Sequence, residues 1–321
     1  MGAKEIKAED LEPEGFVKEK IEEIIAIVGG NLAINALSGG VDSSTVTMLG
    51  HKALGDRLKT CFINNGLMRE DEPEQVRSLF EKLGVKVEMI DAQEQFFAAL
   101  KGVTDPEEKR EAITRTFYRD VFGKLVRESG AKFLLQGTIL TDIEETVAGI
   151  KRQHNILEQL GIDPEREFGY KIIEPLIQLR KDGVRKVAEA LGLPMPVYNR
   201  APFPGPALAA RVIGEVTVER IAVVRKATAI VEEELKDRAA FQCMAILHED
   251  RVTGMREGKR EYGMQIEIRS WESKDARTAM PTRLSYDTLD RLSERITGEV
   301  PAVVSVTYNI TKKPPSTMEA V

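Results

Sequence analysis

One short segment constrains the fold of this chain more than any other. Residues 32–37 form an apolar run, residues 38–44 read SGGVDSS, and a helical pattern of apolar residues follows over 43–54. This order is typical of a buried strand that turns directly into a helix. Gly39 and Gly40 permit a tight turn and a close approach of the backbone to a ligand, because neither carries a Cβ.

The same turn has the composition of a site for phosphate groups. The first turn of a helix directs unpaired amides and the positive end of its dipole at the preceding loop. Ser38, Ser43 and Ser44 add hydroxyl donors, whereas Asp42 would repel an anion unless a cation such as Mg²⁺ lies there too. No lysine follows the glycines, so the segment lacks the classical loop for γ-phosphate transfer. The alternative is an ordinary glycine turn before a capped helix.

Strand and helix signals alternate along the first part of the chain, which predicts parallel βα units. Such units bind ligands at the carboxyl ends of their strands. We therefore expect residues 38–44, 64–66 and 136–138, which each follow a strand, to converge on one crevice. Residues 139–170 are polar and predict a mobile loop, before a last βα unit over 170–191. The predicted strands are 32–37, 59–63, 85–90 and 132–136, and the predicted helices are 16–28, 43–54, 73–83, 93–100 and 104–129.

A proline-rich segment divides the chain. Residues 193–206 contain five prolines, which continue neither a helix nor a central strand. We expect a domain over 1–195 with an α/β fold built on a parallel sheet, and a small α+β domain over 196–321. In the second domain, the patterns predict helices at 217–236 and 285–297 and strands at 241–247, 263–270 and 302–310.

Composition excludes several classes of protein. The net charge of −6 disfavours a broad nucleic-acid surface. No stretch approaches the roughly 20 apolar residues of a membrane span, and the charged first twenty residues are unlike a signal peptide. Cys61 and Cys243 lie far apart, and no Cys-x-x-Cys occurs. This favours a reduced, cytoplasmic protein with two buried thiols, and the alternative is one disulfide between them. The three histidines have no metal-site spacing.

The loop over 38–44 resembles the signature, or PP-loop, of the N-type ATP pyrophosphatases. Further strings narrow the resemblance to the GMP synthase family, in the family's order from about residue 17 to 319. No glutaminase domain precedes the loop and no Gly-x-Cys-x-Gly nucleophile occurs, so the chain resembles the separate synthetase subunit of archaea. The matching strings are NGLMR at 65–69, GVTDPEEKR at 102–110, QGTI at 136–139, EPL at 174–176, PFPGP at 202–206, RVIGE at 211–215 and KPP at 313–315.

The resemblance implies a ligase of purine nucleotide biosynthesis that uses ATP and Mg²⁺. ATP would adenylate the O2 of the xanthine base of XMP and release pyrophosphate. Ammonia from a separate glutamine amidotransferase subunit would then displace AMP and give GMP. The implied fold is a Rossmann-like domain of the adenine nucleotide alpha-hydrolase type, followed by a dimerisation domain that would form a homodimer.

The resemblance also implies a set of residues for ATP. Asp42, Lys151 and Asp142 would be catalytic, with Asp42 near Mg²⁺ and Lys151 closing over the phosphates from the predicted mobile loop. The alternatives are ordinary turn chemistry at the strand ends, a solvated helix charge at Arg115 and a merely polar loop at Asp142 and Lys151. The residues implied for ATP and pyrophosphate are Ser38, Gly39, Gly40, Val41, Asp42, Ser43, Ser44, Asn65, Gly66, Leu67, Arg115, Gln136, Gly137 and Thr138.

For the acceptor XMP, the resemblance implies Pro204, Gly205, Arg269, Lys313 and Glu319. Arginine and lysine suit the 5′-phosphate of a nucleotide, the former through its bidentate fork. The glutamate would read the N–H edge of the purine. The alternative is a frayed C-terminal tail without a function.

Several positions depart from the family pattern, and they concentrate in the predicted mobile loop and the acceptor domain. Two other functions therefore stay open at this point. One is a divergent ATP pyrophosphatase that activates a different carbonyl acceptor, and the other is a non-catalytic paralogue that binds nucleotide. The departures are Asn64, Leu140, Thr141, residues 153–168, Ala201, Ala207, Glu257, Gly258 and residues 318–321.

Overall fold

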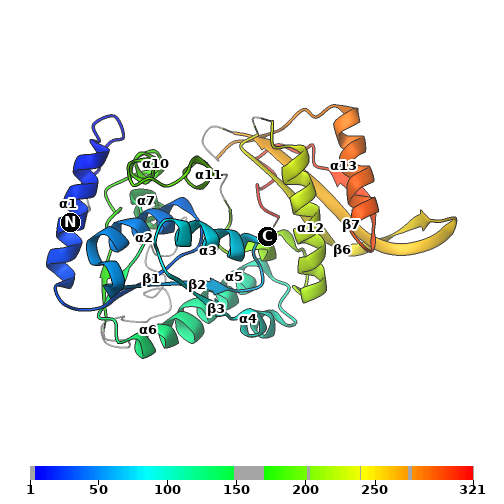
Figure 1. Cartoon of the computed structure of the whole chain (residues 1–321). Helices are drawn as coiled ribbons and strands as arrows, with labels where there is room; N and C mark the ends of the chain where they lie inside the picture. Colours follow the sequence, from blue (N-terminus) through cyan, green and yellow to red (C-terminus); the bar gives the residue numbers. More distant parts are fainter. Residues whose placement is uncertain (1–3, 148–169, 201–202, 239, 274–276, 321) are drawn as a thin grey trace. The chain divides into compact units, whose positions relative to one another are not determined.

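The computed structural model describes residues 4–147, 170–200, 203–238, 240–273 and 277–320 (Figure 1). The chain forms two compact units. The first unit takes in the chain up to residue 64, then 72–92 and 114–200, and the second takes in 65–71, 93–113 and the chain from residue 201. The predicted division after residue 195 is a single cut, whereas two short internal segments group with the C-terminal part. Each unit is described by itself.

The first unit is built on a parallel sheet with the order β3-β2-β1-β4-β5. All four neighbouring pairs are parallel, with Ala36 opposite Cys61 and Ala33 opposite Phe133. The carboxyl ends of the strands therefore lie at one edge of the sheet, and the predicted α/β fold is confirmed. The strands are β1 (Ala33–Ala36), β2 (Leu58–Asn64), β3 (Val87–Asp91), β4 (Phe133–Leu135) and β5 (Lys171–Ile173).

A buried helix, α2 (Val41–Leu54), anchors the loop over 38–44 on this sheet. The side chain of Asn35 on β1 donates to the Thr47 hydroxyl at 2.6 Å and accepts from the Thr60 hydroxyl on β2 at 2.8 Å. These buried polar groups satisfy one another, so α2 can pack closely on the strands. The other helices of this unit are α1 (Pro13–Val28), α3 (Glu72–Lys82), α6 (Gly123–Ser129), α7 (Leu140–Val147), α10 (Lys181–Ala190) and α11 (Met195–Tyr198).

The helical run predicted over 104–129 is interrupted in its middle. It begins with α5 (Pro106–Arg115), where the Asp105 carboxylate accepts the amides of Glu107 and Glu108 at 2.9 and 3.0 Å. A π-helical stretch, Thr116–Phe122, then leads into α6. Nothing in the apolar periodicity indicated this change of winding.

The proline-rich segment contains one helical turn that was not predicted. That turn is α11, and Pro196 is its second residue. A proline there costs no hydrogen bond, because first-turn amides have no intrahelical acceptor. The prolines therefore continue no long helix, but they permit this single turn.

The second unit has the predicted α+β character, and its sheet is mixed. Strand β7 pairs antiparallel with β6 and β8 and parallel with β9. Helix α12 packs on β6 and α13 packs on β9. The elements are α4 (Gln93–Leu100), η3 (Ala207–Arg211), α12 (Val218–Glu234), β6 (Gln242–Arg256), β7 (Lys259–Glu272), β8 (Met280–Pro281), α13 (Tyr286–Glu299) and β9 (Val303–Tyr308).

The β6–β7 hairpin is longer than predicted and forms the yellow ribbon in Figure 1. The two strands continue to Arg256 and from Lys259 around a two-residue turn. Both turn residues, Glu257 and Gly258, have positive φ angles of 50° and 78°, the backbone that suits a tight hairpin. The charged sequence over 248–262 hid these strands, because an exposed ribbon needs no apolar alternation.

Two observations bear on the predictions from composition. Cys61 and Cys243 are free thiols, the first buried and the second half-buried. Within the described ranges, the structure contains no helix with the length and apolar character needed to cross a membrane.

Candidate functional site

The glycine turn between β1 and α2 has a backbone that other residues would not adopt. Gly39 has a φ of +78°. A Cβ at this position would lie 2.8 Å from Cγ2 of Val76, which is closer than a real contact allows. Two reasons therefore require glycine at this position: the positive φ angle and the lack of space for a Cβ.

Hydroxyl groups hold the turn in shape from within. The Ser43 hydroxyl lies 2.8 Å from that of Ser38, accepts the Ser38 amide at 3.2 Å and donates to the Gly40 carbonyl at 3.1 Å. Gly40 occupies the N-cap of α2, so no side chain there can bond the first-turn amides. Amides without an intrahelical acceptor at the start of a long helix are suited to anionic oxygens.

Asp42 is a mostly buried carboxylate in the first turn of α2. Its Oδ2 accepts from Nζ of Lys181 at 2.6 Å. Its Oδ1 is buried and accepts no hydrogen bond from any residue that the structure describes. Burial raises the pKa of Asp42, while the charge of Lys181 opposes that rise. A buried carboxylate oxygen that accepts no hydrogen bond is a suitable ligand for a cation.

Two basic residues that the sequence analysis did not single out support this loop. Lys181 begins α10 and pairs with Asp42. Arg200 donates to the Gly39 carbonyl at 3.4 Å and forms an ion pair with buried Glu72 at 2.5 Å. A lysine at the start of a helix that follows the last parallel strand was a signal available in the sequence. Arg200 gave none, because its contacts join distant segments.

The segment after β4 packs against the start of α2. A Cβ on Gly137 would lie 3.2 Å from the backbone of both Asp42 and Ser43, so this glycine permits the close approach. The Gln136 amide donates to the Thr138 hydroxyl at 3.1 Å. The predicted meeting of these two strand ends is confirmed within the first unit.

The other residues expected near ATP have different surroundings. In the first turn of α7, Asp142 accepts the Ile139 amide at 3.0 Å, and its charge contributes to the raised pKa of Asp42. Arg115 is exposed at the end of α5. Lys151 lies outside the described residues.

The segment after β2 belongs to the second unit. Asn65 accepts the Leu67 amide at 2.8 Å, and Gly66 has a φ of +74° with Phe97 only 2.7 Å from where a Cβ would be. The Leu208 amide of η3 donates to the Leu67 carbonyl at 2.9 Å. Within this unit the segment thus meets the helix that directly follows the proline-rich string. Its predicted place beside the glycine turn stays a prediction.

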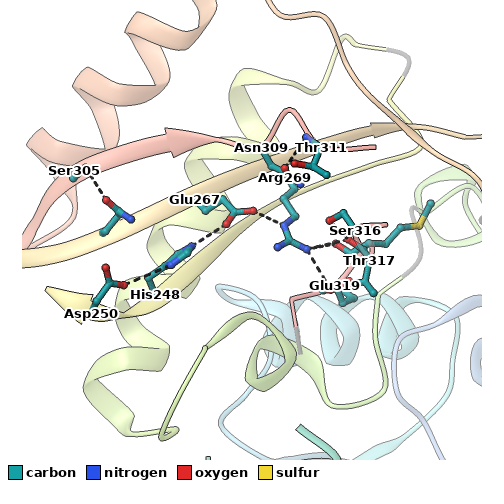
Figure 2. A network of polar contacts seen from close by, with 12 residues as sticks. His248, Asp250, Glu267, Arg269, Ser305, Asn309, Thr311, Ser316, Thr317 and Glu319 are labelled. Carbon is teal, nitrogen blue, oxygen red and sulfur yellow. Dashed lines mark hydrogen bonds and ion pairs between the residues drawn. The ribbon is translucent and has the colours of Figure 1, made fainter. Parts of the chain in front are cut away.

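Two of the residues expected to bind the acceptor contact each other through the C-terminal tail. Figure 2 shows the Arg269 guanidinium against this tail, where Nη1 donates to the carbonyls of Thr317 at 2.9 Å, Met318 at 3.4 Å and Glu319 at 3.3 Å. The buried indole of Trp271 donates to the Met318 carbonyl at 3.3 Å. The alternative of a frayed tail is wrong for these three residues.

The remaining acceptor residues lie elsewhere in the second unit. Pro204 accepts the Ala207 amide at 2.9 Å, and Gly205 is exposed in the same turn. Lys313 pairs through its backbone with Ala279 at 2.9 and 3.0 Å. It lines a cavity of about 1030 Å³ that also contains Glu272 and three further cationic side chains. These cations are Arg238, Arg283 and Lys312.

Comparison with known proteins decides the family. Residues 14–117 match the family model for NAD synthase, and residues 229–320 match that for the GMP synthase C-terminal domain. A relative from Archaeoglobus fulgidus is 50% identical over 309 residues, which cover 96% of this chain and 99% of the relative. Relatives from Pyrococcus furiosus (49%; 95% and 97%) and Methanocaldococcus jannaschii (45%; 96% and 99%) are similar. All three are named as one subunit of a glutamine-hydrolyzing GMP synthase.

The chain belongs to this family of GMP synthase subunits. The resemblance predicted from the motifs is thereby confirmed, as is an enzyme of the ligase class that forms a C–N bond. The main predicted function is supported, and the divergent and non-catalytic alternatives are not.

The two family models of this GMP synthase subunit fall on different sheets. The NAD synthase match contains β1, β2 and β3 with the glycine turn, and the C-terminal match contains β6, β7 and β9 with the tail. The departures from the family pattern do not touch the turn over 38–44. The two family models thus match separately built parts of the chain.

Proposed function

We propose that this GMP synthase subunit uses ATP to activate XMP and then aminates it to GMP with ammonia. The observation that carries the proposal is the glycine turn at 38–40, where first-turn amides of α2 lie beside the mostly buried carboxylate of Asp42. Such a turn suits a diphosphate that must be held while it leaves.

The residues of the turn would act by position and charge. Amides and hydroxyls of Ser38 to Ser44, with Gln136, Gly137 and Thr138 beside them, would bind the β- and γ-phosphates. Because pyrophosphate is a good leaving group when its charge is neutralised, the first step needs no protein nucleophile. Asn65, Gly66, Leu67 and Arg115 would complete the nucleotide site, and Lys151 would close over the phosphates.

The chain fits Mg²⁺ as a companion of ATP. The orphaned Oδ1 of Asp42 is a free carboxylate ligand, and Asp142 lies near enough to affect its pKa. Among the described residues, no group of three or more His, Cys, Asp or Glu side chains forms a closed metal cage. Mg²⁺ is commonly held by one or two carboxylates together with substrate phosphates. When bound, it would neutralise charge on the departing pyrophosphate.

The acceptor nucleotide would be recognised by the second unit. Lys313 contributes a cation to a strongly basic cavity, which suits the 5′-phosphate of XMP. Pro204, Gly205 and Arg269 would contribute further contacts, and Glu319 would accept the purine N–H. These roles are our proposal for XMP. In it, the predicted domain over 1–195 binds ATP and the predicted domain over 196–321 binds XMP.

The protein would receive ammonia from a separate glutaminase subunit. The relatives are named as a single subunit of an enzyme that hydrolyses glutamine, which supports a second chain that carries out the hydrolysis. We further propose a homodimer formed through residues 196–321. Sedimentation at micromolar concentration tests this, and a monodisperse monomer would contradict it.

One assay tests the proposed function. The protein is incubated with Mg-ATP, XMP and ammonium, and pyrophosphate and GMP are both measured. Equal amounts of the two products are expected. Pyrophosphate without GMP would indicate another acceptor, and ATP binding without turnover would indicate a non-catalytic protein. Ammonium replaces the glutaminase subunit, so the result does not depend on the partner.

A further inference from the structure

A chain of polar contacts crosses the second unit from β6 to the C-terminal tail (Figure 2). On β6, the Nε2 of His248 lies 2.8 Å from Oε2 of Glu267 on the neighbouring strand β7. The other oxygen of Glu267, Oε1, accepts Nε of Arg269 at 2.5 Å. Glu267 therefore joins a histidine to an arginine with one oxygen for each.

The carboxylate of Glu267 is ionised in this setting. Its side chain and that of Arg269 are only 15% and 12% exposed. Burial alone would raise the pKa of Glu267, but hydrogen bonds from His248 and Arg269 outweigh burial and lower that pKa. A largely buried, charged pair of this kind fixes orientation, because neither partner can rotate without losing its counter-charge.

The orientation of Arg269 determines what its guanidinium can bind. Nε is used by Glu267, and Nη1 donates to the carbonyls of residues 317, 318 and 319. A guanidinium forms bidentate contacts through Nε with Nη2 or through Nη1 with Nη2. Each pair contains a nitrogen that is already engaged, so this arginine is built to hold the tail.

The side-chain carboxylate of Glu319 on this tail is itself held in place. Oε1 of Glu319 accepts from the Gln242 amide at 2.8 Å, and Oε2 lies 3.4 Å from Nε of the fully buried Arg211. The Glu319 side chain remains 17% exposed. Since two carboxylate oxygens offer about four acceptor positions, capacity remains for a ligand N–H.

We propose that Glu267 is a positioning residue for the acceptor nucleotide. By fixing the Arg269 guanidinium on the tail carbonyls, it sets the Glu319 carboxylate in the place where that carboxylate accepts the purine N–H. Arg269 then acts through the tail and not as a fork for the 5′-phosphate. The inference rests on the proposed function, in which Glu319 reads XMP.

A double-mutant cycle tests whether Glu267 acts through Glu319. Glu267→Gln removes the charge that orients Arg269, and it should raise KM for XMP about tenfold while KM for ATP changes less than about twofold. Combined with Glu319→Gln, it should add little to the effect of the latter alone. Multiplication of the two separate effects would overturn the proposal.

Matched variants separate positioning from loss of folding. Glu261→Gln removes the charge of another glutamate on β7, which pairs with Arg256 of β6 at 3.1 Å, and should leave both KM values unchanged. Glu267→Asp keeps the charge on a shorter side chain and should recover part of the XMP affinity. No recovery, or an equal rise in KM for ATP, would contradict the role.

The single tryptophan provides a readout that does not need activity. Because the Trp271 indole donates to the Met318 carbonyl, its emission reports the position of the tail. Glu267→Gln should shift this emission to longer wavelength, and Glu261→Gln should not. Emission identical to that of the unmodified protein would overturn the proposal. If the unmodified protein makes no GMP from XMP, the proposed function fails first, and the emission result still decides the tail contact.

Discussion

The glycine turn and the region expected to bind the acceptor are stabilised by different kinds of contact. The first depends on residues close together in the sequence, and the second on residues far apart. In the turn, Ser38 and Ser43 are five residues apart and their contacts shape a stretch of backbone. In the acceptor region, Glu319 is held by Gln242 and Arg211, which lie 77 and 108 residues away along the chain. A turn made of local backbone appears in the sequence as one continuous motif, whereas contacts between distant side chains do not.

This difference also sets how each region should respond to substitution. Backbone amides cannot be removed by changing a side chain, so the turn is sensitive where a Cβ would distort it or where Asp42 is lost. The acceptor region is a set of separate side chains, each of which contributes part of the affinity for XMP. We therefore expect large losses of turnover in the turn and graded losses of affinity in the acceptor region.

The largest effect is expected from Asp42→Asn. The change removes the buried carboxylate charge with little change in shape, and pyrophosphate release should fall on the order of 100-fold or more. Pyrophosphate is measured with Mg-ATP, XMP and ammonium present. Asp56→Asn, at an exposed position just past the far end of α2, is the matched control. Turnover close to that of the control would remove Asp42 from the ATP site.

A smaller and more selective effect is expected from Lys313→Ala. Losing a charge-assisted contact of roughly 1.5–3 kcal/mol should raise KM for XMP by about 10- to 100-fold. KM for ATP should change much less. Lys259→Ala, beside the hairpin turn, serves as the control. Equal rises in KM for XMP and for ATP would argue against binding of the acceptor's phosphate by this lysine. They would also weaken the distinction between the two regions.

Gly39→Ala tests the backbone side of the comparison. The positive φ and the 2.8 Å approach to Val76 should cost about 1–2 kcal/mol and displace the turn, so KM for ATP should rise about tenfold. Gly30→Ala, where a Cβ would meet nothing within 4 Å, should be nearly silent. If the two variants had the same KM for ATP, the shape of the backbone at this turn would not determine ATP binding.

The smallest effect concerns pH. The hydrogen bond to Glu267 is the main cause that raises the pKa of His248, with Asp250 adding to it and burial and Arg269 opposing it. A raised folded pKa stabilises the protein at pH values below the ordinary histidine pKa, and this contribution is lost as pH rises through the folded pKa. His248→Gln should flatten the decline in the urea midpoint between about pH 6 and 8. If the slope of the urea midpoint against pH were the same in this variant, the contact of His248 with Glu267 would not contribute to stability.

Much of the first unit could be predicted because its signals are local. The apolar run at 32–37, the two glycines and the helical period after them each specify one element, and parallel βα units place the strand ends together. Lys181 and Arg200 were missed. The place of Lys181 at the start of a helix was visible in the sequence, but its pairing with Asp42, like that of Arg200 with Glu72, is made only by the fold.

Less of the second unit could be predicted. The motifs named Arg269 and Glu319, but no sequence pattern indicated that one holds the tail that carries the other. The ribbon over 248–262 was overlooked because its charged residues do not alternate with apolar ones. Likewise, the single turn of α11 was not predicted, because the prolines were read only as residues that cannot continue a helix.

We propose that the glycine turn is the place where the pyrophosphate of ATP is held. A crystal structure of the protein with Mg-ATP tests this most directly. We predict the β- and γ-phosphate oxygens within hydrogen-bond distance of the amides of residues 39–43 and of the Ser38 and Ser43 hydroxyls. A triphosphate bound away from this turn would contradict the account, even if the protein still made GMP.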